Sequence, residues 1–187
     1  MTPRESRRLE LLDLMADYLL REGLRGASLR PLAAAAGTSS RMLLYYFADK
    51  DELIGATLKH MAETLMRLLD DSLVGAERLP FPELLPVIWE ATRSPELKPH
   101  MTLWLELAAL AARGEEPFLG IAGQICDGFM AWAGRRLQVD RPSDLVPFSA
   151  LLLVTVDGLG LMEAAGRART AEAALHGATS RGLRKGD

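Results

Sequence analysis

The sequence predicts an all-α protein of 187 residues, and two features of its pattern lead to that class. Apolar residues recur at spacings of three and four, which is the period of amphipathic helices, and no stretch alternates between apolar and polar residues as a strand does. Glycine and proline separate the apolar stretches instead of filling them. Apolar residues make up 49% of the chain, which is enough for a folded core, and the single cysteine excludes an internal disulfide.

The first predicted helix covers residues 3–22. Thr2 and Glu5 have the spacing of a capping box, and Pro3 suits the first turn because the N–H that it lacks would be unpaired there. Gly23 follows the last apolar position and is expected to end the helix.

Two short helices are predicted next, at residues 28–36 and 39–46. Ser28 is a suitable N-cap for the first of them, and Gly37 makes the turn between them. Two short helices that meet at a glycine are typical of a helix-turn-helix. A long helix then runs over about residues 49–72, capped by an aspartate, and is expected to bridge two regions of the chain.

The rest of the chain is also predicted to be helical. A linker covers residues 74–82, where glycine and proline are frequent, and residues 179–187 form a tail. Five helices lie between them, the second bent near Pro99, at about residues 83–93, 95–113, 115–138, 143–165 and 170–178. We expect the chain to divide into two domains, at residues 1–50 and residues 51–187.

Residues 145–162 form the most apolar stretch of the chain and allow two interpretations. Their length is close to that of a membrane span, but Asp157 within the stretch would cost roughly 3 kcal/mol on insertion. A helix that is apolar on nearly all sides is otherwise buried. We therefore expect a buried helix, in the core or at a subunit interface, and no membrane partner.

The charge is spread unevenly along the chain. The net charge of −3 argues against coating nucleic acid by bulk charge but leaves room for a local DNA-binding surface. Residues 1–60 carry nine basic and eight acidic side chains, whereas residues 61–187 carry thirteen and seventeen. The first residues contain no apolar segment typical of a secretory signal, so we expect a cytoplasmic protein.

The second helix of the predicted motif carries side chains suited to DNA. The N-terminal residues of a recognition helix reach base edges in the major groove, where Arg41 can bond guanine and Met42 can contact a thymine methyl group. Tyrosines and Lys50 can bind phosphates. The predicted DNA-binding residues are Ser28, Arg30, Thr38, Ser39, Ser40, Arg41, Met42, Tyr45, Tyr46 and Lys50.

Three arginines near the N-terminus, Arg4, Arg7 and Arg8, can add phosphate contacts that do not depend on base sequence. The alternative interpretation of the whole region is a three-helix bundle with solvated charges. Helix-turn-helix geometry is common, so the geometry alone does not decide between these interpretations.

Residues 28–53 resemble the DNA-binding domain of the tetracycline-repressor (TetR) family. The most specific part of the resemblance is the pair Tyr46 and Phe47, followed three residues later by Lys50. The other matching positions are Ser28, Arg30, Leu32, Ala33, Gly37, Ser39, Leu43, Glu52 and Leu53.

The resemblance implies a role for each of these positions and for several of their neighbours. Phosphates would be held by Tyr46 and Lys50, and the residues that face DNA would be Arg30, 38–42 and 45. The chain departs from the family at Arg41 and Met42, where glycine and threonine are frequent, and at Leu44, where tyrosine is frequent. The base preference is therefore expected to differ from that of other members.

The resemblance also implies a dimer, formed by two long C-terminal helices that pair with those of a second copy. Here these would be residues 115–138 and 143–165. The first carries a stripe of small residues, which permits close approach of helices, at Gly120, Gly123, Gly128, Ala131 and Gly134. The alternative is that all faces of these helices belong to the core.

In the family, helices of the C-terminal region surround an effector pocket. The side chains expected there suggest an apolar or aromatic effector; they are Trp89, Met101, Trp104, Leu105, Phe118, Ile125 and Phe129. The alternative is that they are core residues, because aromatic and methionine side chains at helical spacing often are. His100 is the titratable group among them.

These observations predict a dimeric, ligand-responsive transcriptional regulator. Its helix-turn-helix DNA-binding domain would be residues 1–50, and its effector-binding and dimerisation domain would be residues 51–187. By resemblance it is a repressor, which a small, largely apolar effector releases from a pseudo-palindromic operator. The alternative is a constitutive dimeric DNA binder, or an activator, without a small-molecule effector. We expect no enzyme, cofactor or metal, because no Ser-His-Asp, metal-ligand or phosphate-loop pattern is present.

Overall fold

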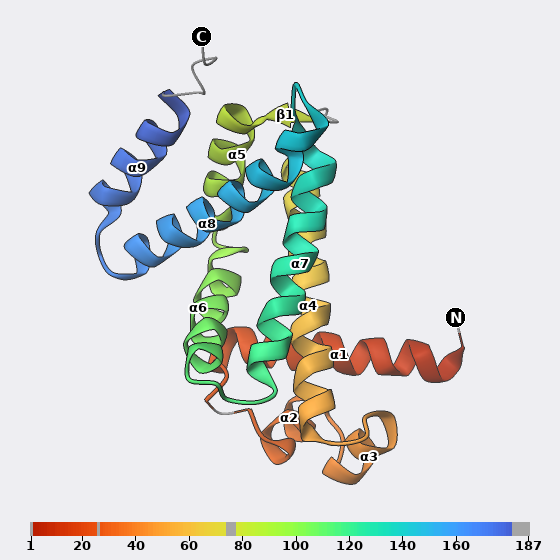
Figure 1. The fold of residues 1–187 in the computed structure, drawn as a ribbon. Coiled ribbons are helices and arrows are strands. Elements are labelled where there is room, and N and C mark those ends of the chain that lie inside the picture. The colour runs from red at the N-terminus through yellow and green to blue at the C-terminus, as the bar shows by residue number, and fades with distance from the viewer. Residues whose placement is uncertain (1, 26, 74–77, 181–187) are drawn as a thin grey trace. The chain divides into compact units, whose positions relative to one another are not determined.

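The computed structural model describes residues 2–25, 27–73 and 78–180, which are almost entirely helical (Figure 1). This confirms the predicted all-α class. The helices are α1 (Pro3–Glu22), α2 (Leu29–Ala35), α3 (Ser40–Tyr46), α4 (Lys50–Ser72), α5 (Phe81–Arg93), α6 (Lys98–Ala112), α7 (Phe118–Arg136), α8 (Leu145–Ala164) and α9 (Ala168–Ser180), with a 3₁₀ turn at Pro142–Asp144.

Two features of the second half differ from the sequence prediction, and part of that prediction is not tested. No strand was expected, but β1 (Leu79–Pro80) and β2 (Leu137–Gln138) form a short parallel pair. The predicted bend near Pro99 is wrong, because α6 begins at Lys98 and the proline lies in its first turn, where its missing N–H costs little. Of the predicted linker, residues 74–77 lie outside the described residues, as do residues 181–187 of the predicted tail. The described remainder differs in part, because α5 already begins at Phe81 and α9 continues to Ser180.

The chain forms two compact units, which we call unit 1 and unit 2. Unit 1 comprises Met1–Leu65 and Thr102–Ile125, and unit 2 comprises Met66–Met101 and Cys126–Asp187. The unit boundaries fall within α4, α6 and α7. The predicted division at residue 50 separates the chain by expected function and stays a prediction.

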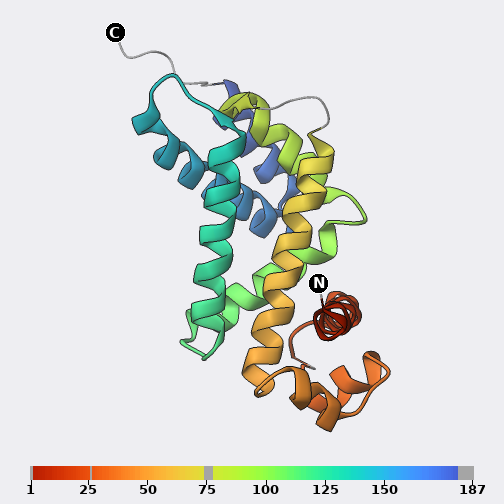
Figure 2. The same ribbon diagram turned by 90° about the vertical axis from the view of Figure 1, so that its right-hand side faces the viewer.

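Unit 1 is held together by an apolar core to which α1, α2, α3, α4, α6 and α7 all contribute. Leu11, Met15 and Leu19 of α1 are fully buried, as is Leu43 of α3. Figure 2 views α1 along its axis, beside α4. A hydrogen bond of 2.6 Å between His60 Nε2 and an Asp13 oxygen also links these two helices.

Both ends of α1 form as the sequence predicts. The Glu5 N–H donates to Thr2 Oγ1 at 3.2 Å, and the Thr2 N–H donates to the Glu5 carboxylate at 2.6 Å, which completes the capping box. Gly23 ends the helix with φ of 74°. A Cβ there would lie 2.7 Å from the carboxylate of Glu106, which accepts the Leu24 N–H at 2.8 Å, so the Glu106 side chain would have to shift.

Unit 2 buries one face of α5, including Leu84, Leu85 and Trp89. The last turn of α4 is tied to α7 through one carboxylate. Asp70 Oδ1 accepts the indole N–H of Trp132 at 2.6 Å and the Nε–H of Arg136 at 2.8 Å.

Helix α8 is buried on one face only, so the expectation of a buried helix is half correct for a single chain. Leu152, Val156 and Leu159 are buried, whereas Val146 and Val154 are both 68% exposed. Among the described residues, one helical stretch has the length and apolar composition of a membrane span, and it is this one, Pro142–Ala164.

Candidate nucleic-acid interface

The two short helices α2 and α3 meet at a tight turn, as a helix-turn-helix requires. Gly37 makes this turn with φ of 60°, a conformation that L side chains rarely adopt. Leu32 and Ala33 of α2 are buried, and so are Leu43 and Phe47 of α3 and its C-cap. Because these apolar side chains point into the core of unit 1, the opposite face of α3 is turned to solvent.

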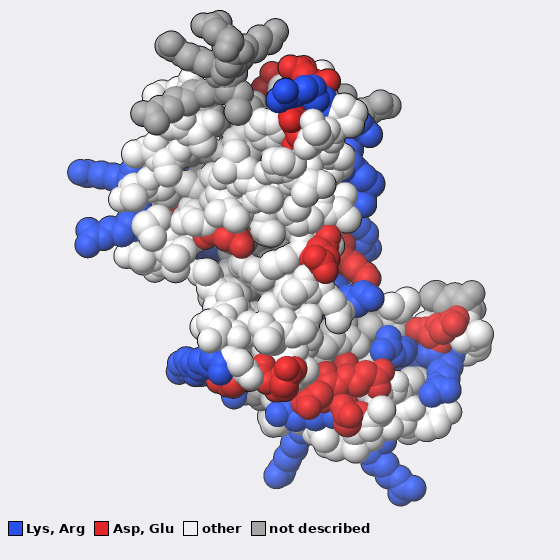
Figure 3. All heavy atoms as spheres, viewed as in Figure 1, with Lys and Arg blue, Asp and Glu red and all other residues white. Residues whose placement is uncertain are grey.

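The exposed face of α3 carries the side chains that the sequence predicted for DNA contact. Tyr45 is 61% exposed and Met42 is 47% exposed, and the Arg41 side chain is also exposed. Figure 3 shows long basic side chains that project outward from the region of α2 and α3, at the bottom of the view. The exposed members of the predicted set are Ser28, Arg30, Ser39, Arg41, Met42, Tyr45 and Lys50, and the half-buried ones are Thr38, Ser40 and Tyr46.

Two serines of the predicted set differ in how they serve the helices. Ser39 caps α3, since its Oγ accepts the Met42 N–H at 3.2 Å, which leaves its hydroxyl hydrogen for donation to a partner. Ser28 occupies the N-cap position of α2 but makes no capping hydrogen bond, so the expected role of its side chain as a cap is wrong.

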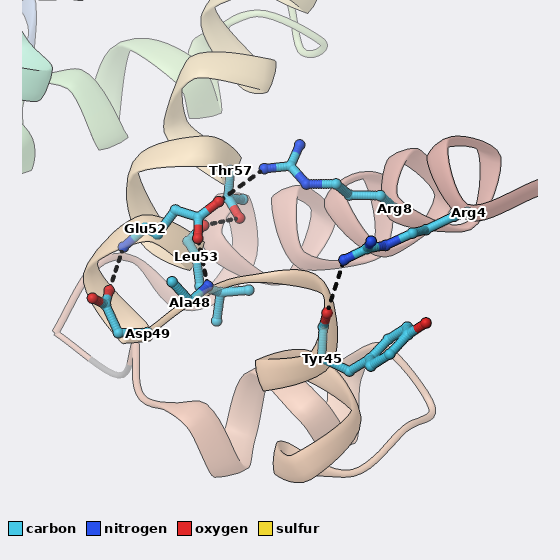
Figure 4. Close-up of polar contacts among 8 residues, drawn as sticks. All are labelled: Arg4, Arg8, Tyr45, Ala48, Asp49, Glu52, Leu53 and Thr57. Carbon is cyan, nitrogen blue, oxygen red and sulfur yellow. Dashed lines mark hydrogen bonds and ion pairs between the residues drawn. The ribbon is translucent and has the colours of Figure 1, made fainter. Parts of the chain in front are cut away.

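The start of α4 places Lys50 beside α3. Asp49 Oδ1 accepts the Glu52 N–H at 2.8 Å, as a cap does, whereas the Glu52 carboxylate accepts the Ala48 N–H instead of the Asp49 N–H that a capping box would use (Figure 4). The carboxylates of Asp49, Asp51 and Glu52 lie at the positive N-terminal end of the α4 dipole, and their negative charge makes this helix end less attractive to an anion. Lys50 is therefore the group in this turn that is suited to phosphate.

Sequence reasoning missed the contacts made by the arginines of α1. Arg4 Nη2 donates to the carbonyl of Tyr45 at 3.3 Å, and Arg8 Nη2 lies 3.4 Å from the Glu52 carboxylate (Figure 4). Arg4 and Arg8 were expected to bind phosphate, yet both are engaged by protein groups. These contacts join residues 41 and 44 positions apart, and no local pattern in the sequence signals them.

The residues predicted to bind an effector are divided between the two units. Trp104, Phe118 and Ile125 pack against the core of unit 1. In unit 2, Trp89 is buried, and the ring of Phe129 lies 5.4 Å from that of Trp132. Met101 also belongs to unit 2, and Leu105 is a half-buried residue of unit 1. Their contact with an effector stays a prediction.

Two buried polar atoms of unit 2 have no hydrogen-bond partner: His100 Nδ1 and Ser149 Oγ. Burial lowers the pKa of His100 below its ordinary 6.5, and the backbone and charge of the nearby Glu96 oppose this effect only in part. Burial therefore favours the neutral form of the imidazole. Ser149 was not among the predicted residues, because a serine in an apolar helix gives no signal of its own.

Helices α7 and α8 each leave a face uncovered in the single chain. A Cβ on Gly120, Gly123 or Gly128 of α7 would meet nothing within 4 Å, so the predicted stripe of small residues faces open space at these positions. On α8, exposed residues recur at spacings of three and four, at Pro147, Leu151, Val154, Gly158 and Leu161, and Val146 and Ala164 are exposed as well.

Residues 11–57 of the chain match the family described as "Bacterial regulatory proteins, tetR family". The chain is 32% identical over 108 residues to the HTH-type transcriptional regulator BetI of Paraburkholderia phytofirmans, and 31% identical over 108 residues to BetI of Paraburkholderia xenovorans. Each match covers 55% of this chain and 55% of the relative, so the chain spans about half the length of these curated relatives.

Solved structures share the fold over nearly the whole chain. One is described as a TetR-family transcriptional regulator from Rhodococcus sp., with a TM-score of 0.76 and 20% identity, over 96% of this chain and 99% of that one. Another is the multidrug binding protein EbrR complexed with proflavin, with a TM-score of 0.68 and 23% identity, over 95% of this chain and 99% of that one. The relatives and neighbours are regulators and not enzymes.

Proposed function

The chain belongs to the tetR family of bacterial regulatory proteins through residues 11–57, and on this premise we propose that it is a cytoplasmic transcriptional regulator that binds a pseudo-palindromic operator as a homodimer. It acts as a repressor, and a small, largely apolar effector releases it from DNA. The observation that carries the proposal is the solvent-facing side of α3, where Arg41, Met42 and Tyr45 are exposed while Leu43 anchors the helix in the core.

Contact with DNA follows from the chemistry of this face. Arg41 can form two hydrogen bonds with guanine, and Met42 can pack against a thymine methyl group. Tyr46 and Lys50 can bind phosphates at either side and so fix the register of the helix in the major groove.

Dimer formation is supported by the uncovered faces of α7 and α8. An exposed apolar stripe on a helix is costly in water, and a second copy of the same helix pair would bury it. A two-fold dimer presents two recognition helices about one DNA turn apart and so makes twice the DNA contacts of one chain. The added contacts matter because the net charge of −3 does not itself attract DNA.

Effector response is supported by the composition of the helices that follow α4. The family neighbour EbrR is complexed with proflavin, and the apolar and aromatic side chains predicted here suit a ligand of apolar character. The effector changes the separation of the two recognition helices in the dimer, and α4, which contributes residues to both units, carries the change. Coupling of this kind is typically ~1–3 kcal/mol.

The experiment uses a duplex that the full-length protein enriches from a pool of randomised duplexes. Affinity is then measured for all single base-pair variants of that duplex. Lys50→Ala should weaken binding to every variant alike, whereas Arg41→Ala should lose discrimination of about 1–3 kcal/mol at one or a few positions. Uniform loss from Arg41→Ala, with every base preference retained, would remove the base-reading role of this residue.

Effector response needs its own measurement. A compound that is confirmed by calorimetry to bind the protein should lower affinity for the enriched duplex by about 5- to 150-fold. Equal affinity with and without the bound compound would favour a constitutive dimeric DNA binder, and higher affinity would favour a ligand-dependent activator.

A further inference from the structure

We propose that Arg4 and Arg8 of α1 are positioning residues that hold the recognition helix α3 and the start of α4 in place, and that they do not bind DNA phosphates. The expected effect on DNA affinity rests on the proposed DNA-binding function, whereas the contacts of Arg4 and Arg8 with α3 and α4 do not depend on DNA.

Arg4 holds the C-terminal end of α3. Its guanidinium donates to the carbonyl of Tyr45 at 3.3 Å and lies 5.2 Å from the centre of the Tyr45 ring. Carbonyls in the last turn of a helix have no partner within the helix, and the negative end of the helix dipole lies there, so a cation is favourable on both counts. Arg4 therefore fixes the end of α3 that also carries Tyr46.

Arg8 connects three elements at once. Its guanidinium lies over the ring of Phe47 at 4.6 Å, and Phe47 is the C-cap of α3 and only 1% exposed. The same guanidinium pairs with Glu52 of α4, whose second oxygen accepts the Ala48 N–H. One side chain of α1 thus covers the end of α3 and stabilises the turn that leads into α4.

These contacts matter because α3 has only seven residues. An isolated helix shorter than about 12 residues is marginal in water, so its position depends on packing against its neighbours. The buried Leu43 fixes the inner face of α3, while Arg4 and Arg8 fix its end. Loss of either arginine would let Tyr46 and Lys50 move relative to Arg41, and the phosphate and base contacts would no longer fit one duplex geometry.

Arg7 provides a matched control on the same helix. It carries the same charge as Arg8, yet it pairs with Glu10 of α1 at 2.7 Å and thus stabilises only its own helix. Arg7→Ala and Arg8→Ala therefore remove equal charge from neighbouring positions, and only the second removes a contact with α3 and α4.

The first measurement is affinity for the enriched duplex as a function of salt. Arg8→Ala should bind about tenfold more weakly than Arg7→Ala, with the same salt dependence, and Arg4→Ala should show a smaller loss of the same kind. Arg8→Lys should not restore binding, because an ammonium group lacks the planar fork that stacks on Phe47 while pairing with Glu52.

For Glu52→Gln, the positioning role and a phosphate-binding role of Arg8 predict opposite changes in DNA affinity. Glutamine can still accept the Ala48 N–H, but it loses the ion pair with Arg8. Positioning predicts weaker binding, although a negative charge near DNA has been removed. Stronger binding by Glu52→Gln would overturn the proposal. So would recovery of affinity by Arg8→Lys, if Arg8→Ala also reduces the salt slope by about 0.9 per lost phosphate contact.

The second measurement needs no DNA and separates this proposal from the proposed function. Amide hydrogen exchange in the full-length protein should be faster in α3 for Arg8→Ala than for Arg7→Ala. Unchanged exchange in α3 would overturn the positioning role. Failure of the wild-type chain to enrich any duplex, with exchange altered as expected, would overturn the DNA-binding function and leave the positioning role intact.

Discussion

Unit 1 and unit 2 differ in what they leave exposed. In unit 1 the exposed side of α3 mixes Arg41 with Met42 and Tyr45, so apolar and cationic groups alternate on a surface suited to a polar partner. In unit 2 the exposed stripe of α8, defined above, contains no charged residue. The comparison shows that the single chain leaves two different kinds of surface exposed. The surface of α3 suits nucleic acid, and the surface of α8 suits a second copy of the chain.

The largest expected effect is on the exposed stripe of α8. Val154→Asp places a charge on a side chain that is 68% exposed in the chain but buried in the proposed dimer, where an unpaired charge costs about 3–5 kcal/mol. Sedimentation of the variant should therefore give a monomer with wild-type helix content. Leu14→Asp, at an exposed apolar residue of α1, is the control and should leave the dimer intact.

A dimeric Val154→Asp would break the comparison between the units, because the stripe of unit 2 would then be ordinary surface. A dimer that is lost in both variants would instead show that added charge, and not the stripe, causes dissociation.

The next effect concerns the polar contact that closes unit 2. Asp70→Ala leaves the buried indole N–H of Trp132 without an acceptor, which should reduce the free energy of unfolding by about 1–3 kcal/mol. Asp70→Asn keeps an acceptor and should lose less. Denaturant unfolding measures both, and equal losses would mean that the carboxylate charge on Arg136, and not the indole, is the important interaction.

A smaller effect tests the close approach within unit 1. Gly23→Ala forces an L side chain into a φ of 74° and toward the Glu106 carboxylate, so it should cost about 2 kcal/mol. Gly37→Ala is the matched control, since its φ is 60° but its Cβ would meet nothing within 4 Å. Thermal unfolding should rank Gly23→Ala below Gly37→Ala. The reverse order would mean that Glu106 moves away without loss.

The smallest effect is the pH dependence that His100 gives to unit 2. Because burial lowers its pKa in the folded state, the unfolded chain binds this proton more readily, and stability falls as pH falls below about 6.5. Thermal unfolding of His100→Gln should show a smaller loss between about pH 7 and pH 5.5 than the wild type. An identical loss in both proteins would assign the acid sensitivity to other groups.

Local features of the fold could be predicted from the sequence because they depend on neighbouring residues. The capping box at Thr2, the turn at Gly37 and the cap at Asp49 each involve residues within a few positions of one another. On α3, the exposed residues Arg41, Met42 and Tyr45 are among those that the sequence assigned to DNA contact by residue type and resemblance. These are the features that define the candidate DNA site.

Long-range pairings could not be predicted, since a pattern along the chain does not say which element comes to lie beside another. The contact of Arg8 with Glu52 spans 44 positions, and that of Leu24 with Glu106 spans 82. The uncovered face of α8 could not be predicted from the sequence for a related reason. A helix that is apolar on all sides must be covered, but the sequence does not say whether the same chain or a second copy covers it.

The central claim is that α3 of unit 1 contacts DNA while the exposed stripe of α8 in unit 2 contacts a second copy of the chain. The most direct test is the mass of the complex, by native mass spectrometry, that the full-length protein forms on its enriched duplex. The account predicts two chains on each duplex for the wild type, and loss of the two-chain complex for Val154→Asp. If Val154→Asp binds each duplex as a single chain with the affinity of the wild type, the claim is contradicted.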